Sequence, residues 1–171
     1  MKKYEMIKEN SMFRIRALKD FADVKKGDVG GLIEKEANLS QDGNCWVYED
    51  ARIYENAQVS GDARVSGDAL VYDDARVYDD ALVYDNARIF DNARVSENAK
   101  VFRNAWVYGE AQISGDTRIF GNAEISGDVR VFGRAWILGN IEVSGDIEIA
   151  EDAWIYGNAK VSENNLKGGE K

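Results

Sequence analysis

The sequence contains no histidine, no proline and a single cysteine among its 171 residues. Without histidine, the chain lacks the side chain that most often transfers protons near neutral pH, which argues against an ordinary acid–base active site. Cys45 has no cysteine partner, so no internal disulfide forms and nothing indicates an oxidising compartment. The absence of proline leaves every backbone N–H available for pairing.

Long apolar runs are also missing. No stretch approaches the length of a membrane-spanning helix, and the start Met1-Lys2-Lys3-Tyr4-Glu5 has no apolar signal region. We therefore expect a soluble, cytoplasmic protein that does not contact a membrane.

Basic side chains are fewer than acidic ones. The sequence has 22 Lys and Arg against 31 Asp and Glu, a net charge of −9, of which residues 1–36 carry +2 and residues 37–171 carry −11. Binding to a phosphate backbone needs clustered Lys and Arg, so direct DNA or RNA binding is not expected. An acidic surface favours solubility or a basic partner.

A six-residue repeat fills the chain from Cys45 to Asn164, in 20 copies with no insertion. The copy Ala63-Arg64-Val65-Ser66-Gly67-Asp68 is typical, and we number its positions slot one to slot six. Slot three is Val or Ile in all 20 copies and slot one is Ala in 15, so these two slots, which point to the same side of a strand, predict the core. Slots two and four then point outward, and the Gly, Asp, Asn and Glu of slots five and six predict corners.

A short strand and a corner in every repeat wind a coil, and three repeats close one triangular turn. The pattern therefore predicts an all-β fold, a single-stranded parallel β-helix solenoid with three flat sheets. We expect residues 1–30 to form an N-terminal leader that caps the solenoid with a β-hairpin around Lys8-Glu9-Asn10-Ser11. The β-helix should span 31–164, with two weaker repeats at 31–36 and 37–42 and an insertion at Gly43-Asn44, and 165–171 should be a polar tail.

Aromatic side chains occupy the outward slots. All four Trp lie in slot two, and 11 of the 20 slot-four residues are Tyr or Phe, which makes a large aromatic surface for a monomer. Residues three repeats apart stack, so these rings gather on two of the three faces and predict an interface. The alternative, which applies above all to Tyr54, Tyr72 and Phe90, is that aromatic ladders only stabilise neighbouring coils. The residues expected to contact a partner or an anionic ligand are Arg88, Phe90, Trp106, Tyr108, Arg118, Phe120, Trp136, Trp154 and Tyr156.

Other features give no catalytic or metal site. Asp73-Asp74 and Asp79-Asp80 could suggest Ca²⁺, but acids one repeat apart occupy different corners and only carboxylates three repeats apart stack, whereas Ca²⁺ takes six to eight oxygens. These acids are therefore interpreted as corner residues. Cys45 fills a slot that is usually Ala and is interpreted as a small buried thiol. We expect no cofactor, no metal and no catalytic residue.

The repeat resembles the hexapeptide-repeat proteins, whose solenoid is left-handed and whose acyltransferases and carbonic anhydrases depend on His. The leader adds a second resemblance, carried by RIRALKDF at 14–21, VKKGDVGG at 24–31, IE at 33–34, LS at 39–40 and GNCWV at 43–47. These segments look like the opening of a largely uncharacterised group of β-helix proteins from bacteria and their phages. The resemblance implies a left-handed solenoid from a bacterial or prophage genome, in the cytoplasm of the bacterial host, and carries over no activity.

Four functions follow as hypotheses. The first is a non-catalytic binding or scaffold protein that self-associates, as a dimer or trimer, through its aromatic faces. The second is a phage-type inhibitor of a host defence or nucleic-acid protein, which traps an anionic nucleotide signal between subunits or imitates DNA. The third is an acyltransferase-like enzyme with a base such as Glu124 or Glu142. The fourth is end-to-end polymerisation through the uncovered coil at Val161.

Overall fold

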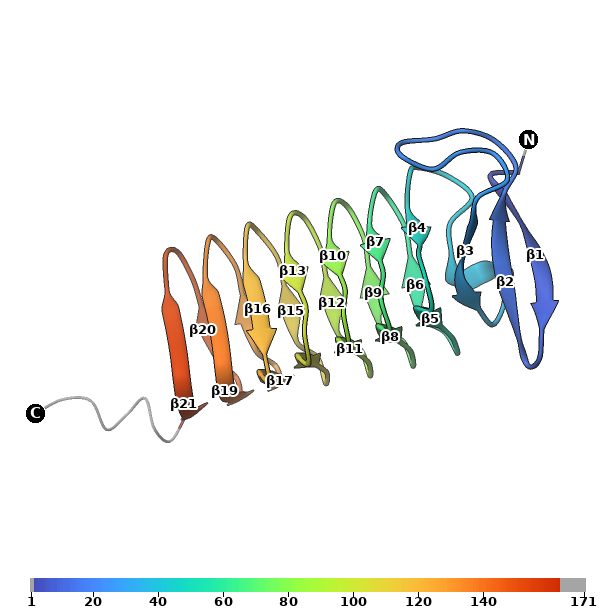
Figure 1. Cartoon of the computed structure of the whole chain (residues 1–171). Helices are drawn as coiled ribbons and strands as arrows, with labels where there is room; N and C mark the ends of the chain where they lie inside the picture. Colours follow the sequence, from blue (N-terminus) through green and yellow to red (C-terminus); the bar gives the residue numbers. More distant parts are fainter. Residues whose placement is uncertain (1, 164–171) are drawn as a thin grey trace, which may run out of the picture.

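The computed structural model describes residues 2–163, which form a rod of stacked coils closed at one end by the N-terminal segment (Figure 1). The predicted tail at 165–171 lies outside the described residues. Apart from one 3-10 turn, η1, the regular structure from Tyr4 to Ser162 is β. The elements are β1 (Tyr4–Glu9), β2 (Met12–Ala17), β3 (Val29–Ile33), η1 (Glu36–Asn38), β4 (Trp46–Val47), β5 (Arg52–Ile53), β6 (Gln58–Val59), β7 (Arg64–Val65), β8 (Leu70–Val71), β9 (Arg76–Val77), β10 (Leu82–Val83), β11 (Arg88–Ile89), β12 (Arg94–Val95), β13 (Lys100–Val101), β14 (Trp106–Val107), β15 (Gln112–Ile113), β16 (Arg118–Gly121), β17 (Glu124–Gly127), β18 (Arg130–Val131), β19 (Trp136–Gly145), β20 (Glu148–Ile149) and β21 (Trp154–Ser162).

Strands three repeats apart pair in parallel, as the sequence pattern predicts. Val65 is the Cα partner of Val47 on one side and of Val83 on the other. We call the stack β4-β7-β10-β13-β16 with the first half of β19 and β21 face one, and the stack β5-β8-β11-β14-β17 with their second half face two. Face three is the sheet of β6, β9, β12, β15, β18 and β20. The predicted parallel β-solenoid is confirmed, while the handedness of its winding stays a prediction.

The sheet count differs from the three flat sheets expected, because β19 and β21 continue through a corner. β19 pairs with β16 through Trp136 to Gly139 and with β17 through Glu142 to Gly145, which joins faces one and two into a single 15-stranded sheet. Face three remains a separate sheet of six strands. The rod nevertheless keeps three faces.

The core is the interior of the triangle, as the slot pattern predicts. Val65 and Val83 are fully buried, and so are the slot-one alanines Ala63 and Ala81. This inward orientation fixes the outward orientation of slots two and four along the whole rod. At the C-terminal end the shielding thins, since Ile155 and Val161 are only partly buried. Among residues 2–163, no strand pairs with the outer edge of β21.

The corners explain why the repeat region is acidic. Every slot-five residue from Glu49 to Gly157 has a positive φ, between 53° and 109°. From Glu49 to Glu97, each acidic slot-five carboxylate accepts the backbone N–H of the slot-five residue one coil further on. Gly67 donates to Glu49 at 2.6 Å and Gly115 donates to Glu97 at 2.6 Å. Asp73 and Asp79 accept in the same way, so they act as corner residues, as interpreted from the sequence.

The leader covers the first coil. β1 and β2 form an antiparallel hairpin, and β2 pairs antiparallel with β3. The weaker repeats then stack on the first strict coil, Ile33 on Ile53 and Leu39 on Val59, with the insertion Gly43-Asn44 lengthening the turn between them. These contacts close the N-terminal strand edges that an open solenoid would expose.

The structure also bears on membrane insertion. Within residues 2–163, none of the helical structure is long and apolar enough to cross a bilayer.

Candidate functional site

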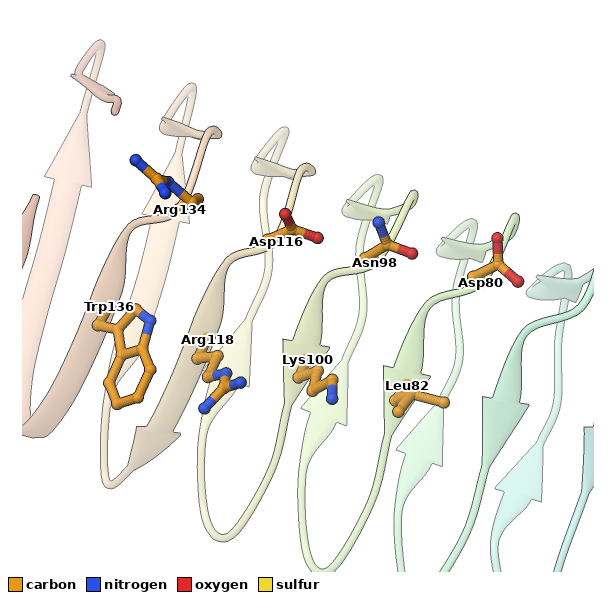
Figure 2. A pocket seen from close by; sticks show the side chains of 8 residues that line it. All are labelled: Asp80, Leu82, Asn98, Lys100, Asp116, Arg118, Arg134 and Trp136. Carbon is orange, nitrogen blue, oxygen red and sulfur yellow. The ribbon is translucent and has the colours of Figure 1, made fainter. Parts of the chain in front are cut away.

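A groove of about 540 Å³ runs along the rod where face one meets the corner that follows face three (Figure 2). Two columns of side chains form it, one from slot six and one from slot two of the next repeat. We call the slot-six residues Asp62, Asp80, Asn98, Asp116, Arg134 and Asp152 the corner column. We call the slot-two residues Trp46, Arg64, Leu82, Lys100, Arg118, Trp136 and Trp154 the face-one column.

The repeat itself places the two columns side by side. Asp116 and Arg118 flank the buried Thr117, and residues on either side of an inward-pointing residue both point outward. Figure 2 shows this pairing at four successive levels, from Asp80 beside Leu82 to Arg134 beside Trp136. Adjacent levels are about 4.8 Å apart, the spacing of neighbouring strands. A ligand or partner in the groove therefore meets a regular array of side chains.

The groove contains charges of both signs that are not neutralised within the rod. Lys100 and Arg118 are Cα partners on β13 and β16, so two cations lie one above the other. Among residues 2–163, neither forms an ion pair, and the same holds for Asp80 and Asp116. Like charges directly opposed on neighbouring strands are destabilising, so this arrangement favours an external partner.

Aromatic contacts arrange the C-terminal half of the face-one column. The Arg118 guanidinium lies over the Trp136 ring at 4.5 Å, and Trp136 stacks on Trp154 with centroids 5.0 Å apart. The Arg134 guanidinium beside them forms an exposed ion pair with Asp152 at 2.8 Å. An exposed ion pair contributes little to stability, so Arg134 stays available for other contacts.

The same column shows how a tryptophan on face one is covered. At the N-terminal end, Trp46 contacts Phe21 of the leader edge-on at 5.4 Å and is only 1% exposed. Tyr48 donates to Asp23 of the leader at 3.0 Å, and burial, together with this hydrogen bond, raises the pKa of Tyr48 to about 12. At the other end Trp154 is 63% exposed and Tyr156 is 71% exposed. The leader therefore covers Trp46 at the N-terminal end of face one, whereas Trp154 at the C-terminal end is open to solvent.

The predicted residues on face two form a separate cluster. Phe90 stacks on Tyr108 at 4.7 Å, and the Arg88 guanidinium lies over Trp106 at 4.9 Å. The column continues through Tyr72, which stacks on Phe90 at 5.0 Å. Each of these rings thus has a stacking or cation–π partner within the rod.

The structure therefore divides the nine predicted site residues between two surfaces. Arg88, Phe90, Trp106 and Tyr108 lie on face two, whereas Arg118, Phe120, Trp136, Trp154 and Tyr156 lie on face one. Phe120 extends the face-one ladder, since it stacks on Phe102 at 4.7 Å and the Arg103 guanidinium lies over it at 5.4 Å.

Sequence reasoning missed the corner column, because it considered slots two and four without slot six of the preceding repeat. It also missed Lys3, which is fully buried and donates to the Cys45 carbonyl at 3.0 Å and the Cys45 Sγ at 3.2 Å. Burial raises the pKa of the Cys45 thiol, and Lys3 opposes that rise. The thiol is fully buried, as its slot predicts, and sits beneath the leader.

Residues 2–163 contain no group of three or more Cys, Asp or Glu side chains placed to hold an ion.

Comparison with known proteins identifies the repeat. The family model described as YdcK Beta solenoid repeat matches residues 57–73, 75–88 and 87–103. A protein of Escherichia coli (strain K12) named "Uncharacterized acetyltransferase YdcK" is 47% identical over 47 residues. That stretch is 27% of this chain but only 14% of the relative, far below two thirds of its length. The family-model matches end before Arg118, so they concern the repeat and leave the C-terminal half of the groove unassigned.

Proposed function

Because this chain is a hexapeptide-repeat β-solenoid protein, we propose that it is a non-catalytic scaffold that binds a second copy of itself through face one. The regular backbone holds an outward surface of indole rings, guanidinium groups and carboxylates at fixed spacing. Trp, Tyr and Arg are the side chains enriched at protein interfaces and at their energetic centres.

One observation carries the proposal, and it is the difference between the two ends of face one. Trp46 is buried under the leader, whereas Trp154 is 63% exposed in the same column. Tyr156 on the same strand is 71% exposed. Exposed aromatic surface that has a covered counterpart within the same column is typical of an interaction site. Since the groove beside it holds both signs of charge, a second copy supplies complementary groups.

The experiment is a measurement of mass in solution. We expect size-exclusion chromatography with light scattering to give a multiple of the 19.1 kDa chain mass at micromolar concentration. Trp154→Ala should weaken association about tenfold or more, the usual effect of truncating an aromatic side chain that dominates a contact. Phe132→Ala, which removes a 39% exposed ring from face three, is the matched control and should leave association unchanged. A clean monomer at tens of micromolar protein contradicts the proposal.

A second candidate is capture of an anionic molecule with an aromatic ring, such as a nucleotide, between subunits. Its support is the contact of Arg118 with Trp136, beside Lys100. A thermal-shift series against a panel of nucleotides tests it, and no shift with any member rejects it. This is the mode of action expected of a phage-type inhibitor.

An acetyl-transfer activity is the third candidate, because the name of the Escherichia coli relative contains it. We propose that this chain does not share it. The sequence has no His to serve as base, and the 47 matched residues are 14% of that relative. Calorimetry with acetyl-CoA decides the point, and saturable binding would favour the enzyme.

A further inference from the structure

We infer that two copies of this chain pair in antiparallel orientation through the C-terminal half of face one, about a two-fold axis between the levels of Arg118 and Trp136. The inference rests on the self-association proposed above and specifies its geometry. It uses the order of charged and aromatic side chains along the two columns that line the groove (Figure 2).

The symmetry determines which residues meet. Two faces that meet about a two-fold axis require the axis to lie in the plane of contact. If this axis is perpendicular to the rod, the levels of the two copies run in opposite order. Each column then lies opposite the same column of the other copy. The opposed pairs are Arg118 with the partner's Trp136, Lys100 with the partner's Trp154, Asp116 with the partner's Arg134, and Asn98 with the partner's Asp152.

These contacts are complementary at every level. Asp116, which forms no ion pair within residues 2–163 of one copy, meets a guanidinium across the axis, and symmetry forms this pair twice. Two cations of the face-one column, Lys100 and Arg118, each meet an indole of the other copy, which is a favourable arrangement for a cation and an aromatic ring. Trp154, the most exposed ring of that column, becomes covered.

The slot-four column of the same face agrees with this register. The opposed pairs there are Phe120 with the partner's Leu138 and Phe102 with the partner's Tyr156. All four side chains are apolar or aromatic, and Tyr156 is 71% exposed in the single copy. Three neighbouring columns are therefore complementary about one axis.

Three neighbouring registers of the antiparallel pair are unfavourable. An axis at the level of Arg118 brings Asp116 opposite the partner's Asp116. An axis at the level of Trp136 brings Arg134 opposite the partner's Arg134. An axis between the levels of Lys100 and Arg118 opposes these two cations to each other. Like charges in contact across an interface weaken it, so each of these three registers is weaker than the one proposed.

The leader argues against a parallel pair. If the axis runs along the rod, each level lies opposite the same level of the other copy, so the two leaders would face one another. The leader covers Trp46 and reaches Arg64, whose guanidinium lies 3.3 Å from Asp23, so it would hold the rods apart at that end (Figure 1). In the antiparallel pair, the level of the partner's Trp154 lies opposite Lys100, and the leader lies further along the rod.

The two arrangements also predict different partners for the same residues. In the parallel pair, each corner residue faces the face-one residue of its own level, so Asp116 would oppose the partner's Arg118 and Arg134 would oppose the partner's Trp136. Substitutions at Asp116 and Arg134 therefore distinguish them. Exchange of the two charges suits the fold, because slot six of this corner accepts both acids and an arginine.

The test is a charge exchange, measured by sedimentation equilibrium of the full chain. Asp116→Arg places two cations in contact across the axis and Arg134→Asp places two acids there, so each alone should weaken the dimer about tenfold or more. The double variant Asp116→Arg/Arg134→Asp should restore the dissociation constant to within about threefold of the parent. An equimolar mixture of the two single variants should form a heterodimer, since both opposed pairs then join opposite charges.

The matched control is Asp128→Arg, the same change in slot six of another corner, and it should leave association unchanged. Circular dichroism during thermal denaturation confirms that each variant keeps its β-structure, which matters because Arg134 also pairs with Asp152 within one copy.

Each outcome decides something. Restoration in the double variant and in the mixture supports the antiparallel pair. A dimer that neither single variant weakens overturns the antiparallel geometry and leaves the scaffold function standing. Loss in the single variants without restoration in the double variant indicates the parallel pair and overturns the antiparallel one as well. A parent chain that is monomeric removes both proposals.

Discussion

Asn122 donates its side-chain amide to the Oδ1 of Asn140 at 2.7 Å, and Asn140 donates in turn to Asn158 at 2.6 Å. The contact belongs to a column of asparagines at the corner between faces one and two, which begins at Asn86 and Asn104. A primary amide both donates and accepts, so identical side chains stacked in register satisfy one another. The column links successive coils on the outside of the rod.

Replacement of Asn122 by Ala should therefore destabilise the rod. The change removes the hydrogen bonds to Asn104 and Asn140, and we expect the free energy of unfolding to fall by about 1 kcal/mol. Urea denaturation followed by circular dichroism measures it. Asp128→Ala is the control, because Asp128 fills slot six at another corner and its side chain forms no hydrogen bond within residues 2–163. An equal loss in both variants contradicts the role of the column.

The fold was predictable because residues three repeats apart occupy equivalent positions in successive coils and therefore share the same surroundings. Once parity places Val65 inward, it places Arg64 and Ser66 outward, and the same holds for every repeat. The asparagine column was equally present in the sequence at this spacing. It was missed because slot six was interpreted as a corner residue and not compared between coils.

The leader was predictable only in outline. Its hairpin has a turn sequence at Asn10, which takes a positive φ, but nothing in the sequence pairs Phe21 with Trp46 or Lys3 with Cys45. These contacts join segments without a shared period, so their geometry depends on the whole chain. The candidate groove was missed for a different reason, since it combines slot six of one repeat with slot two of the next.

Thr117 gives a prediction of increased stability. Its side chain is fully buried in slot one, and its hydroxyl forms no hydrogen bond with any residue in 2–163. An unsatisfied buried hydroxyl costs free energy, so Thr117→Val, which keeps the shape, should raise the free energy of unfolding by about 1–2 kcal/mol. The midpoint of urea denaturation reports it. The reverse change at an apolar slot-one residue, Val129→Thr, should lower the midpoint. A fall in stability for Thr117→Val refutes the reasoning.

Alanine substitutions at Gly139 and Gly157 distinguish the cost of a steric collision from the cost of backbone strain. Both have positive φ, 109° and 94°, but a Cβ on Gly139 would lie 2.3 Å from the carbonyl oxygen of Gly157, whereas a Cβ on Gly157 would meet nothing within 4 Å. Gly157→Ala should therefore cost only the left-handed strain, about 1–2 kcal/mol, whereas Gly139→Ala should cost several kcal/mol and loosen the last coil. Denaturation and hydrogen exchange of β21 measure the difference. Equal costs would show that the backbone of the last coil moves aside freely.

Tyr48 makes the leader sensitive to alkaline pH. Burial and the hydrogen bond to Asp23 raise its pKa to about 12, and burial also raises the pKa of Tyr4. A group whose pKa is higher in the folded state contributes stability that is complete below its unfolded value, about 10, and is lost as the pH rises through the folded value. The leader should thus detach from face one between about pH 10 and 12.

Detachment uncovers Trp46, so the transition is followed by a red shift of tryptophan fluorescence. Tyr48→Phe removes the titrating hydroxyl while keeping the ring, and it should move this transition to higher pH. Tyr156→Phe, on the exposed part of face one, is the control and should leave it in place. An alkaline transition that Tyr48→Phe leaves unmoved would mean that Tyr4 alone governs it, through its hydrogen bond to the Leu39 carbonyl at 2.6 Å.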